Sequence, residues 1–189
     1  MPSPTPEGKD AQTMTLEAFA DTIVPGEKRS PDDRAIAGAA EGGGAVQAGA
    51  IELLEWDATG LSESLDGFSS ALDAHADAYA AEHGLTLDES VPPFVALPFE
   101  HRTALVQELT TPGHPEKALW VSLALFSNMA FDSAAHMHTA DALAQGHPGL
   151  IALGIEKPGP DGLWRFDEYT YGRPLARLHP ATTPSGSPA

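Results

Sequence analysis

The sequence contains no cysteine and few basic residues, and each shortage excludes a class of function. Without cysteine among its 189 residues, the chain forms no disulfide framework, no thiolate nucleophile and no cysteine zinc site. Its 10 Lys and Arg stand against 27 Asp and Glu, which gives a formal net charge of −17. Because nucleic acids and anionic lipid surfaces are bound by basic side chains, this balance argues against both as partners.

A long hydrophobic run is also missing. The longest apolar stretch, residues 118–131, is interrupted by Ser122, Ser127 and Asn128 and is shorter than the roughly 20 residues of a membrane span. It predicts a helix buried in a core, and no membrane insertion. The first 13 residues are polar and proline-rich, with neither a signal-peptide pattern nor a twin-arginine pair. We therefore expect a cytoplasmic protein, with export alongside a partner as the alternative.

Apolar residues make up 42% of the chain and recur at helical spacing, whereas no alternating pattern is long enough for a sheet. Thr15 is the expected N-cap of the first helix, and Leu65, Phe68 and Leu72 are expected to be buried together. The sequence predicts an all-α bundle of five to six helices with an extended, aromatic-containing C-terminal arm. The expected helices cover residues 16–24, 45–55, 62–83, 98–109 and 115–135, with a further piece to residue 145.

Composition divides the chain into four parts. We expect a disordered lead over residues 1–13, a helical domain over residues 14–146 and a disordered tail over residues 180–189. Residues 147–179 form the predicted arm, which is rich in proline yet carries aromatic side chains that disordered segments usually lack. The arm should pack on its own domain or on a partner, where aromatic side chains and Arg are common anchors. The expected anchors are Trp164, Phe166, Tyr169, Tyr171 and Arg173.

One segment has a possible catalytic pattern: Asp132-Ser-Ala-Ala-His136-Met-His138-Thr-Ala-Asp141. On a helix, Asp132 lies one turn before His136 and His138 one turn before Asp141, so each carboxylate can orient an imidazole as a general base or metal ligand. The two histidines, however, diverge by about 200° on a helix and share a face only on extended backbone. The alternative is two locally satisfied Asp/His pairs with a structural role. A metal site would need distant ligands such as His75, His101, His114 or His147.

No other motif for catalysis or cofactor binding is complete. Residues 42–44 are three glycines, but they lack the preceding strand and the following Lys-Ser/Thr of a phosphate loop. A Gly-x-Ser-x-Gly nucleophile elbow is also missing. The sequence therefore predicts that the chain itself holds no flavin, haem or other cofactor.

The N-terminal segment Thr15-Leu-Glu-Ala-Phe-Ala-Asp21-Thr-Ile-Val-Pro25-Gly26 resembles the opening of the small subunit of gluconate 2-dehydrogenase and its relatives, the subunit 3 family. Residues 44–54 are similar to the Gly/Ala-rich segment and helix that follow in that family. The segments Met129-Ala-Phe-Asp132 and His136-x-His138 also resemble those of an actinobacterial group of Ala/Gly-rich proteins.

The resemblance implies a small helical accessory subunit of a flavin-dependent oxidoreductase of the glucose-methanol-choline type. Members of that family hold no flavin themselves. They help the large subunit to mature and, through a twin-arginine signal, carry it across the membrane. This sequence shows no such signal, which favours a cytoplasmic role beside the enzyme. The family supplies no catalytic residues that can be transferred to this chain.

Three functions therefore remain open. The first is a non-catalytic accessory or maturation subunit that binds a large flavoprotein through its helical face and its arm. The second is a stand-alone enzyme of the cyclase or isomerase type, with the Asp132, His136, His138 and Asp141 cluster in an apolar cavity. The third is a small-molecule binding protein with the same cavity and no turnover. A cavity lined by these histidines would favour the second.

Overall fold

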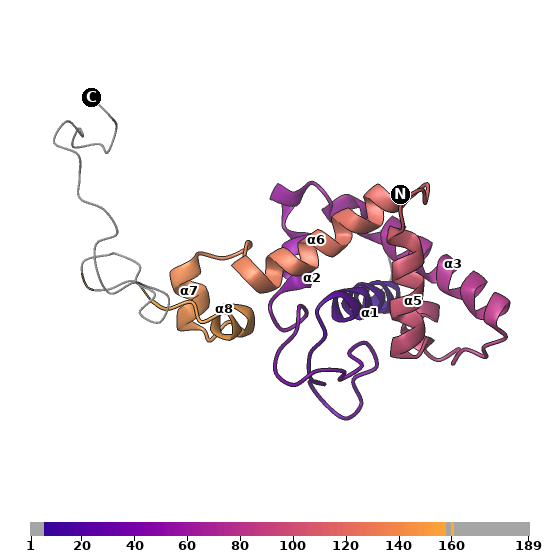
Figure 1. The fold of residues 1–189 in the computed structure, drawn as a ribbon, viewed down its shortest axis with the longest axis horizontal. Coiled ribbons are helices and arrows are strands. Elements are labelled where there is room, and N and C mark those ends of the chain that lie inside the picture. Colours follow the sequence, from indigo (N-terminus) through magenta and orange to yellow (C-terminus); the bar gives the residue numbers. More distant parts are fainter. Residues whose placement is uncertain (1–5, 158–159, 161–189) are drawn as a thin grey trace. The chain divides into compact units, whose positions relative to one another are not determined.

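The computed structural model describes residues 6–157 and residue 160, with the side chains of residues 6–9 excepted. These residues form α-helices and short 3-10 helices and no strand, which confirms the all-α prediction (Figure 1). Residues 1–154 make one compact unit, and the remainder of the chain makes a second. The elements are α1 (Pro6–Ile23), α2 (Ala50–Glu55), η1 (Asp57–Thr59), η2 (Ser62–Ser64), α3 (Leu65–His83), α4 (Pro93–Ala96), α5 (Phe99–Thr110), α6 (Lys117–Ser133), α7 (Thr139–Ala144) and α8 (Pro148–Ala152).

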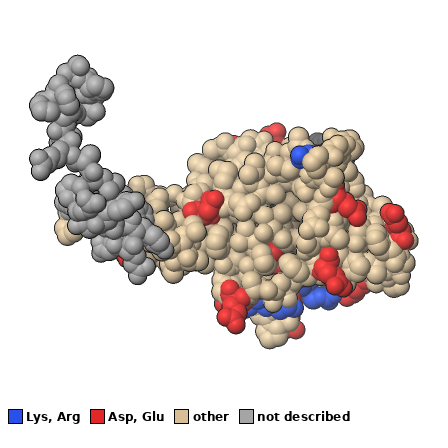
Figure 2. Space-filling view, in the orientation of Figure 1, with Lys and Arg blue, Asp and Glu red and all other residues tan. Residues whose placement is uncertain are grey.

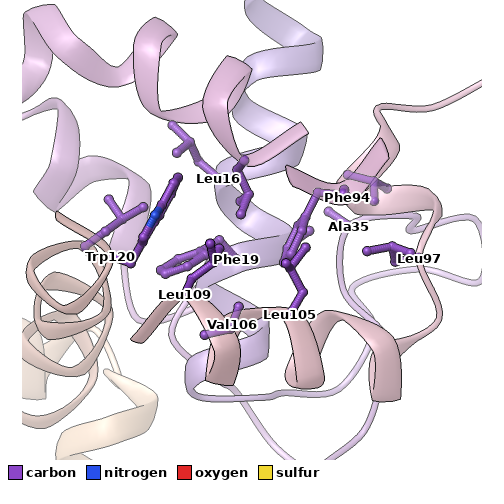
Figure 3. Close-up of a cluster of buried hydrophobic side chains, with 14 of the residues drawn as sticks. Leu16, Phe19, Ala35, Phe94, Leu97, Leu105, Val106, Leu109 and Trp120 are labelled. Carbon is purple, nitrogen blue, oxygen red and sulfur yellow. The ribbon is translucent and has the colours of Figure 1, made fainter. Parts of the chain in front are cut away.

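Helix α1 lies at the centre of the first unit and packs against α2, α3, α4, α5 and α6. Its side chain Phe19 is 1% exposed and meets two other buried rings. The ring centroid of Phe19 lies 6.4 Å from that of Phe94 and 6.2 Å from that of Trp120, within the range of favourable aromatic pairs. Figure 3 shows these rings together with the apolar side chains of α5, including Leu105 and Leu109. One core therefore joins helices from both halves of the unit.

The expected N-cap role of Thr15 is wrong. Helix α1 begins at Pro6, and Thr15 lies inside it with no exposed surface. Its hydroxyl donates a hydrogen bond to the carboxylate of Asp73 on α3 at 3.1 Å, so it is used between helices rather than at a helix end. The same carboxylate accepts from the backbone N–H of Phe94 at 3.1 Å. Asp73 thus ties α1, α3 and α4 together.

The helix predicted over residues 62–83 is confirmed, with a short 3-10 turn, η2, before α3. It ends at Gly84, whose φ of 65° is the left-handed conformation typical of a helix C-cap. Leu65 and Leu72 are buried in the core and Phe68 packs against it partly buried, so the expected register is correct. Among the described residues, no helix has the length and apolar character needed to span a membrane.

Two short helices replace segments that the sequence assigned to turn or arm. Helix α4 starts at Pro93, where only a turn is expected, and α8 starts at Pro148, inside the predicted arm. Both prolines occupy the first helical turn, where the missing N–H costs no hydrogen bond and the fixed φ suits a helix. The extended arm therefore does not begin at residue 147, because residues 148–152 are helical and pack on α6.

Two buried charged side chains hold the loop between α1 and α2. The carboxylate of Asp21, 1% exposed, accepts from the backbone N–H of Gly26 at 3.1 Å and of Ala37 at 2.8 Å. The guanidinium of Arg102 on α5, 4% exposed, donates to four backbone carbonyls at 2.5–3.3 Å. Burial raises the pKa of Asp21 and lowers that of Arg102. The carbonyls belong to Arg34, Ala35, Val95 and Leu97.

We expect Arg102→Met to lower the free energy of unfolding by about 3–5 kcal/mol, because it leaves several buried carbonyls without a donor and the Asp21 charge without its neighbouring cation. Urea unfolding followed by far-UV circular dichroism measures the change. The control is Arg34→Met, since the exposed guanidinium of Arg34 pairs with the exposed Asp88. This control should cost about 1 kcal/mol or less. Equal costs for the two variants would contradict the role of Arg102.

Candidate functional site

The structure does not bring the four residues of the predicted catalytic segment together. Helix α6 ends at Ser133, and Ala134 then has a φ of 49°, a left-handed conformation that is uncommon outside glycine. His136 therefore does not continue the helix face that carries Asp132. Asp132 is exposed, and between these two described side chains there is no hydrogen bond. The expected Asp132/His136 pair is not formed.

His138 and Asp141 have places at the start of α7. The Nδ1 atom of His138 accepts a hydrogen bond from the backbone N–H of Ala140 at 3.3 Å, so His138 is the N-cap of this helix. Asp141 follows in the first turn, where a carboxylate interacts favourably with the helix dipole. Both side chains are exposed. The spacing of three residues between His138 and Asp141 is therefore explained by the start of a helix, in which one residue is the N-cap and the other lies in the first turn.

His136 instead lines a pocket of about 430 Å³ between α2 and the α7–α8 end of the unit. Glu52 of α2 and the buried His147 line the same pocket. The Nδ1 atom of His147 accepts from the backbone N–H of Leu150 at 3.3 Å, and its Nε2 donates to the carbonyl of Ala48 at 3.0 Å. Both nitrogens are used, which fixes the neutral imidazole with its proton on Nε2. The sequence analysis named His147 only as one of four distant histidines that could join a metal site with His136, and it did not name Glu52.

The imidazole of His136 packs against Gly49, the N-cap of α2. Gly49 has a φ of 87°, a left-handed conformation that favours glycine, and a Cβ atom there would lie 2.4 Å from Nε2 of His136. Glycine is therefore required both by the backbone conformation and by the close approach of the ring. The Nδ1 atom of His136 is buried and has no hydrogen-bond partner. Burial lowers the pKa of His136 and nearby His147 lowers it further, against the opposing effect of Glu52. His136 is therefore neutral near pH 7.

The other histidines do not add ligands to this pocket. His75 lies 2.7 Å from a carboxylate oxygen of Glu116, measured from its Nε2, and His101 lies 3.1 Å from the hydroxyl of Tyr79, measured from its Nδ1. These contacts belong to the side of the unit formed by α3, α5 and the start of α6. Among the residues that the structure describes, no three His, Asp or Glu side chains are grouped closely enough to hold a metal ion. The pocket offers an imidazole and a carboxylate to a small molecule.

A second candidate feature is an exposed apolar surface on α6 and α8. Residues 118–131 contain no charged side chain, and in Figure 2 the surface over α6 is mostly free of charged groups. Leu125 and Met129, one turn apart on α6, are 55% and 40% exposed. Ile151 and Leu153, in α8 and at its C-cap, are 58% and 49% exposed. We call these four side chains the apolar surface. Within the described part of the chain, only Trp56 is a further exposed large hydrophobic residue.

The two elements that carry the apolar surface are in close contact. A Cβ atom on Gly149 of α8 would lie 1.8 Å from the carbonyl oxygen of Phe131 on α6, so only glycine allows this approach. The five anchors expected in the arm lie outside the described residues, and their role stays a prediction. They are Trp164, Phe166, Tyr169, Tyr171 and Arg173.

The fold and site define a small helical domain with a histidine-lined pocket and a helix, α6, that has no charged side chain over residues 118–131. Comparison with protein families places the chain more closely. The model of a family of unknown function, DUF5987, matches residues 10–189, and the chain therefore belongs to this family. Neither the curated proteins nor the solved structures contain a match to it.

We expect Gly49→Ala to destabilise the protein by about 1 kcal/mol more than Gly60→Ala. Both glycines have positive φ, so both variants carry the cost of a left-handed alanine, about 1–2 kcal/mol. A Cβ at Gly60 meets no atom within 4 Å, whereas one at Gly49 displaces the His136 ring. Thermal unfolding measures the cost, and the imidazole NMR signals of His136 report its displacement. Unchanged His136 signals in Gly49→Ala would contradict the contact.

Proposed function

We propose that the protein is a non-catalytic accessory subunit of a flavin-dependent oxidoreductase of the glucose-methanol-choline type. The observation that carries the proposal is the exposed face of α6 over residues 118–131, which has no charged side chain although the chain has a net charge of −17. A helix exposed to water normally presents charged side chains, whereas the centres of protein interfaces are depleted in charge and enriched in residues such as Met. A partner that covers this face would bury Leu125 and Met129.

The N-terminal resemblance supports the proposal through its structural residues. The buried carboxylate of Asp21 accepts from the N–H of Gly26, and a Cβ on Gly26 would lie 2.3 Å from the backbone nitrogen of Gly44. Asp21, Gly26 and Gly44 therefore build the loop after α1, and none of these three residues lines the pocket. A resemblance of this kind favours a common scaffold with a shared binding role.

The charge of the chain also suggests what the partner surface is like. A net charge of −17 attracts a partner with basic groups around an apolar centre, and like-charged proteins are repelled. We therefore expect the flavoprotein to present an apolar patch that is bordered by Lys and Arg. Association should weaken as the salt concentration rises, since screening reduces the attraction between exposed charges.

The test is co-purification of a tagged copy of the protein with the untagged products of its genomic neighbours. The proposal expects a captured large subunit with the absorbance of bound flavin. Leu125→Glu/Met129→Glu should reduce the captured flavoprotein at least tenfold, because it places two carboxylates in the interface centre. The matched control is Ser70→Glu/Ala74→Glu, which adds the same charges one turn apart on the exposed side of α3. Capture without flavin, or equal capture by both double variants, would overturn the proposal.

A second function is favoured by the pocket itself. His136 lines a cavity of about 430 Å³, within the usual range of small-molecule sites, and its neutral imidazole can act as a general base. In such an enzyme the residues beside His136 would be Glu52 and His147, which line the pocket, and not Asp132, His138 and Asp141. Incubation of the purified protein with a metabolite extract, followed by mass spectrometry, tests it. Turnover that is lost in His136→Gln and retained in His138→Gln would establish an enzyme in place of an accessory subunit.

A further inference from the structure

Helix α6 has two opposite faces, and each has the residue spacing of a helix that packs on a neighbour. Its buried face packs on the unit and consists of Trp120, Leu123, Ser127 and Ala130. The residues of the other face are exposed, and they follow one another at alternating steps of four and three residues. We call these residues the outer stripe: Ala118, Ser122, Leu125, Met129 and Asp132. Alternating steps of this kind are the heptad pattern by which one helix packs along another.

The charges of α6 lie at its two ends. Residues 118–131 contain no charged side chain, whereas Lys117 lies in the first turn of the helix and the exposed Asp132 lies in the last. Each has the unfavourable sign for the dipole of its own helix, because a cation is disfavoured at the N-terminus and an anion at the C-terminus. Among the described side chains, neither has a hydrogen bond or an ion pair that would offset this. Both charges can therefore pair with a second helix that runs in the opposite direction.

We propose that the outer stripe is the contact surface of an antiparallel homodimer, in which α6 packs along α6 of a second copy of the chain. Leu125 is the centre of the stripe, seven residues from Ala118 and seven from Asp132. A two-fold axis beside Leu125 places the Lys117 end of each helix against the Asp132 end of the other. Each charge then meets an opposite charge and the favourable end of the opposite helix dipole. A parallel pair would place like charges together.

The net charge of the chain favours this face for contact with a second copy. Two chains of −17 repel each other wherever their acidic side chains meet. Residues 118–131 contain no acidic side chain, and Figure 2 shows the surface over α6 mostly free of charged groups. Two copies can therefore approach here with little local repulsion. A contact through one helix is at the small end of specific interfaces, so the dimer should dissociate on dilution.

The homodimer and the proposed flavoprotein complex use the same face of α6, so the dimer describes the chain before that partner binds. The two associations differ in their response to salt. Salt weakens the attraction between an acidic chain and a partner with basic groups, as proposed above. It strengthens the association of two chains of −17, because screening of their mutual repulsion outweighs screening of the two Lys117–Asp132 pairs.

Sedimentation velocity on the full chain, without the flavoprotein, tests the dimer. The native chain should change from monomer to dimer as its concentration rises, with more dimer in about 0.5 M salt than in about 0.05 M salt. Leu125→Glu/Met129→Glu should remain monomeric, whereas the matched control Ser70→Glu/Ala74→Glu on α3 should still dimerise. A native chain that is monomeric at every concentration would overturn the proposal and leave the outer stripe to the flavoprotein. A dimer that Leu125→Glu/Met129→Glu does not weaken would overturn it too.

Exchange of the two end charges tests the antiparallel orientation. Asp132→Lys places its ammonium group against Lys117 of the second copy, and Lys117→Glu places its carboxylate against Asp132. Each should raise the Kd of the dimer about tenfold, since a two-fold dimer contains the pair twice. For Asp132→Lys this loss occurs although the chain becomes less negative, which by itself favours association.

The double variant Lys117→Glu/Asp132→Lys restores opposite charges across the interface and keeps the net charge of −17. It should dimerise as the native chain does. Each single change suits the dipole of its own helix, so thermal unfolding should show no loss of stability that could explain a weaker dimer. A double variant that associates no better than the single variants would contradict the antiparallel contact.

Discussion

The buried guanidinium of Arg102 is the constraint on which the arrangement of the unit depends. It donates hydrogen bonds to carbonyl groups in the loop before α2 and at the C-terminal end of α4, two segments far apart in the chain. The Asp21 carboxylate does the converse, since it accepts hydrogen bonds from the backbone N–H groups of Gly26, near the start of the same loop, and Ala37, near its middle. A loop that cannot form its own hydrogen-bond ladder is thereby satisfied and fixed. Because this loop leads into Gly49 and α2, it also places one wall of the pocket.

The parts of the fold that the sequence predicts are those in which local pattern and packing agree. Helix α3 has a sustained apolar stripe and a glycine stop, and its core side chains Leu65 and Leu72 lie where the pattern places them. The start of α1 could not be predicted, because Thr15 has the features of an N-cap but its hydroxyl is used by Asp73 of another helix. Helices α4 and α8 have four and five residues, too few for a periodic pattern, and they are stable only because they pack on the rest of the unit.

In the candidate site, too, the sequence predicts what depends on local pattern and misses what depends on tertiary contacts. The sequence identifies His136 as a residue of interest, but the partner that it assigns, Asp132, depends on a helix that continues past Ser133. The turn at Ala134 ends that helix, and an alanine in a left-handed conformation gives no signal in a sequence. Glu52 and His147 reach the pocket from helices that are adjacent to His136 only in the folded chain. The need for glycine at position 49 could not be predicted either, because it follows from the contact with the His136 ring, which only the folded structure shows.

Helix α8 connects the two features that bear on function. Its N-terminal residues His147 and Pro148 line the pocket, whereas Ile151 and Leu153 belong to the apolar surface. The close approach of Gly149 to the carbonyl of Phe131 packs this short helix directly on α6. A ligand that displaces the His147 cap therefore acts on the same short helix that carries Ile151. Conversely, a partner that holds Ile151 and Leu153 in place also stabilises the pocket wall that His147 and Pro148 form, because linkage acts equally in both directions.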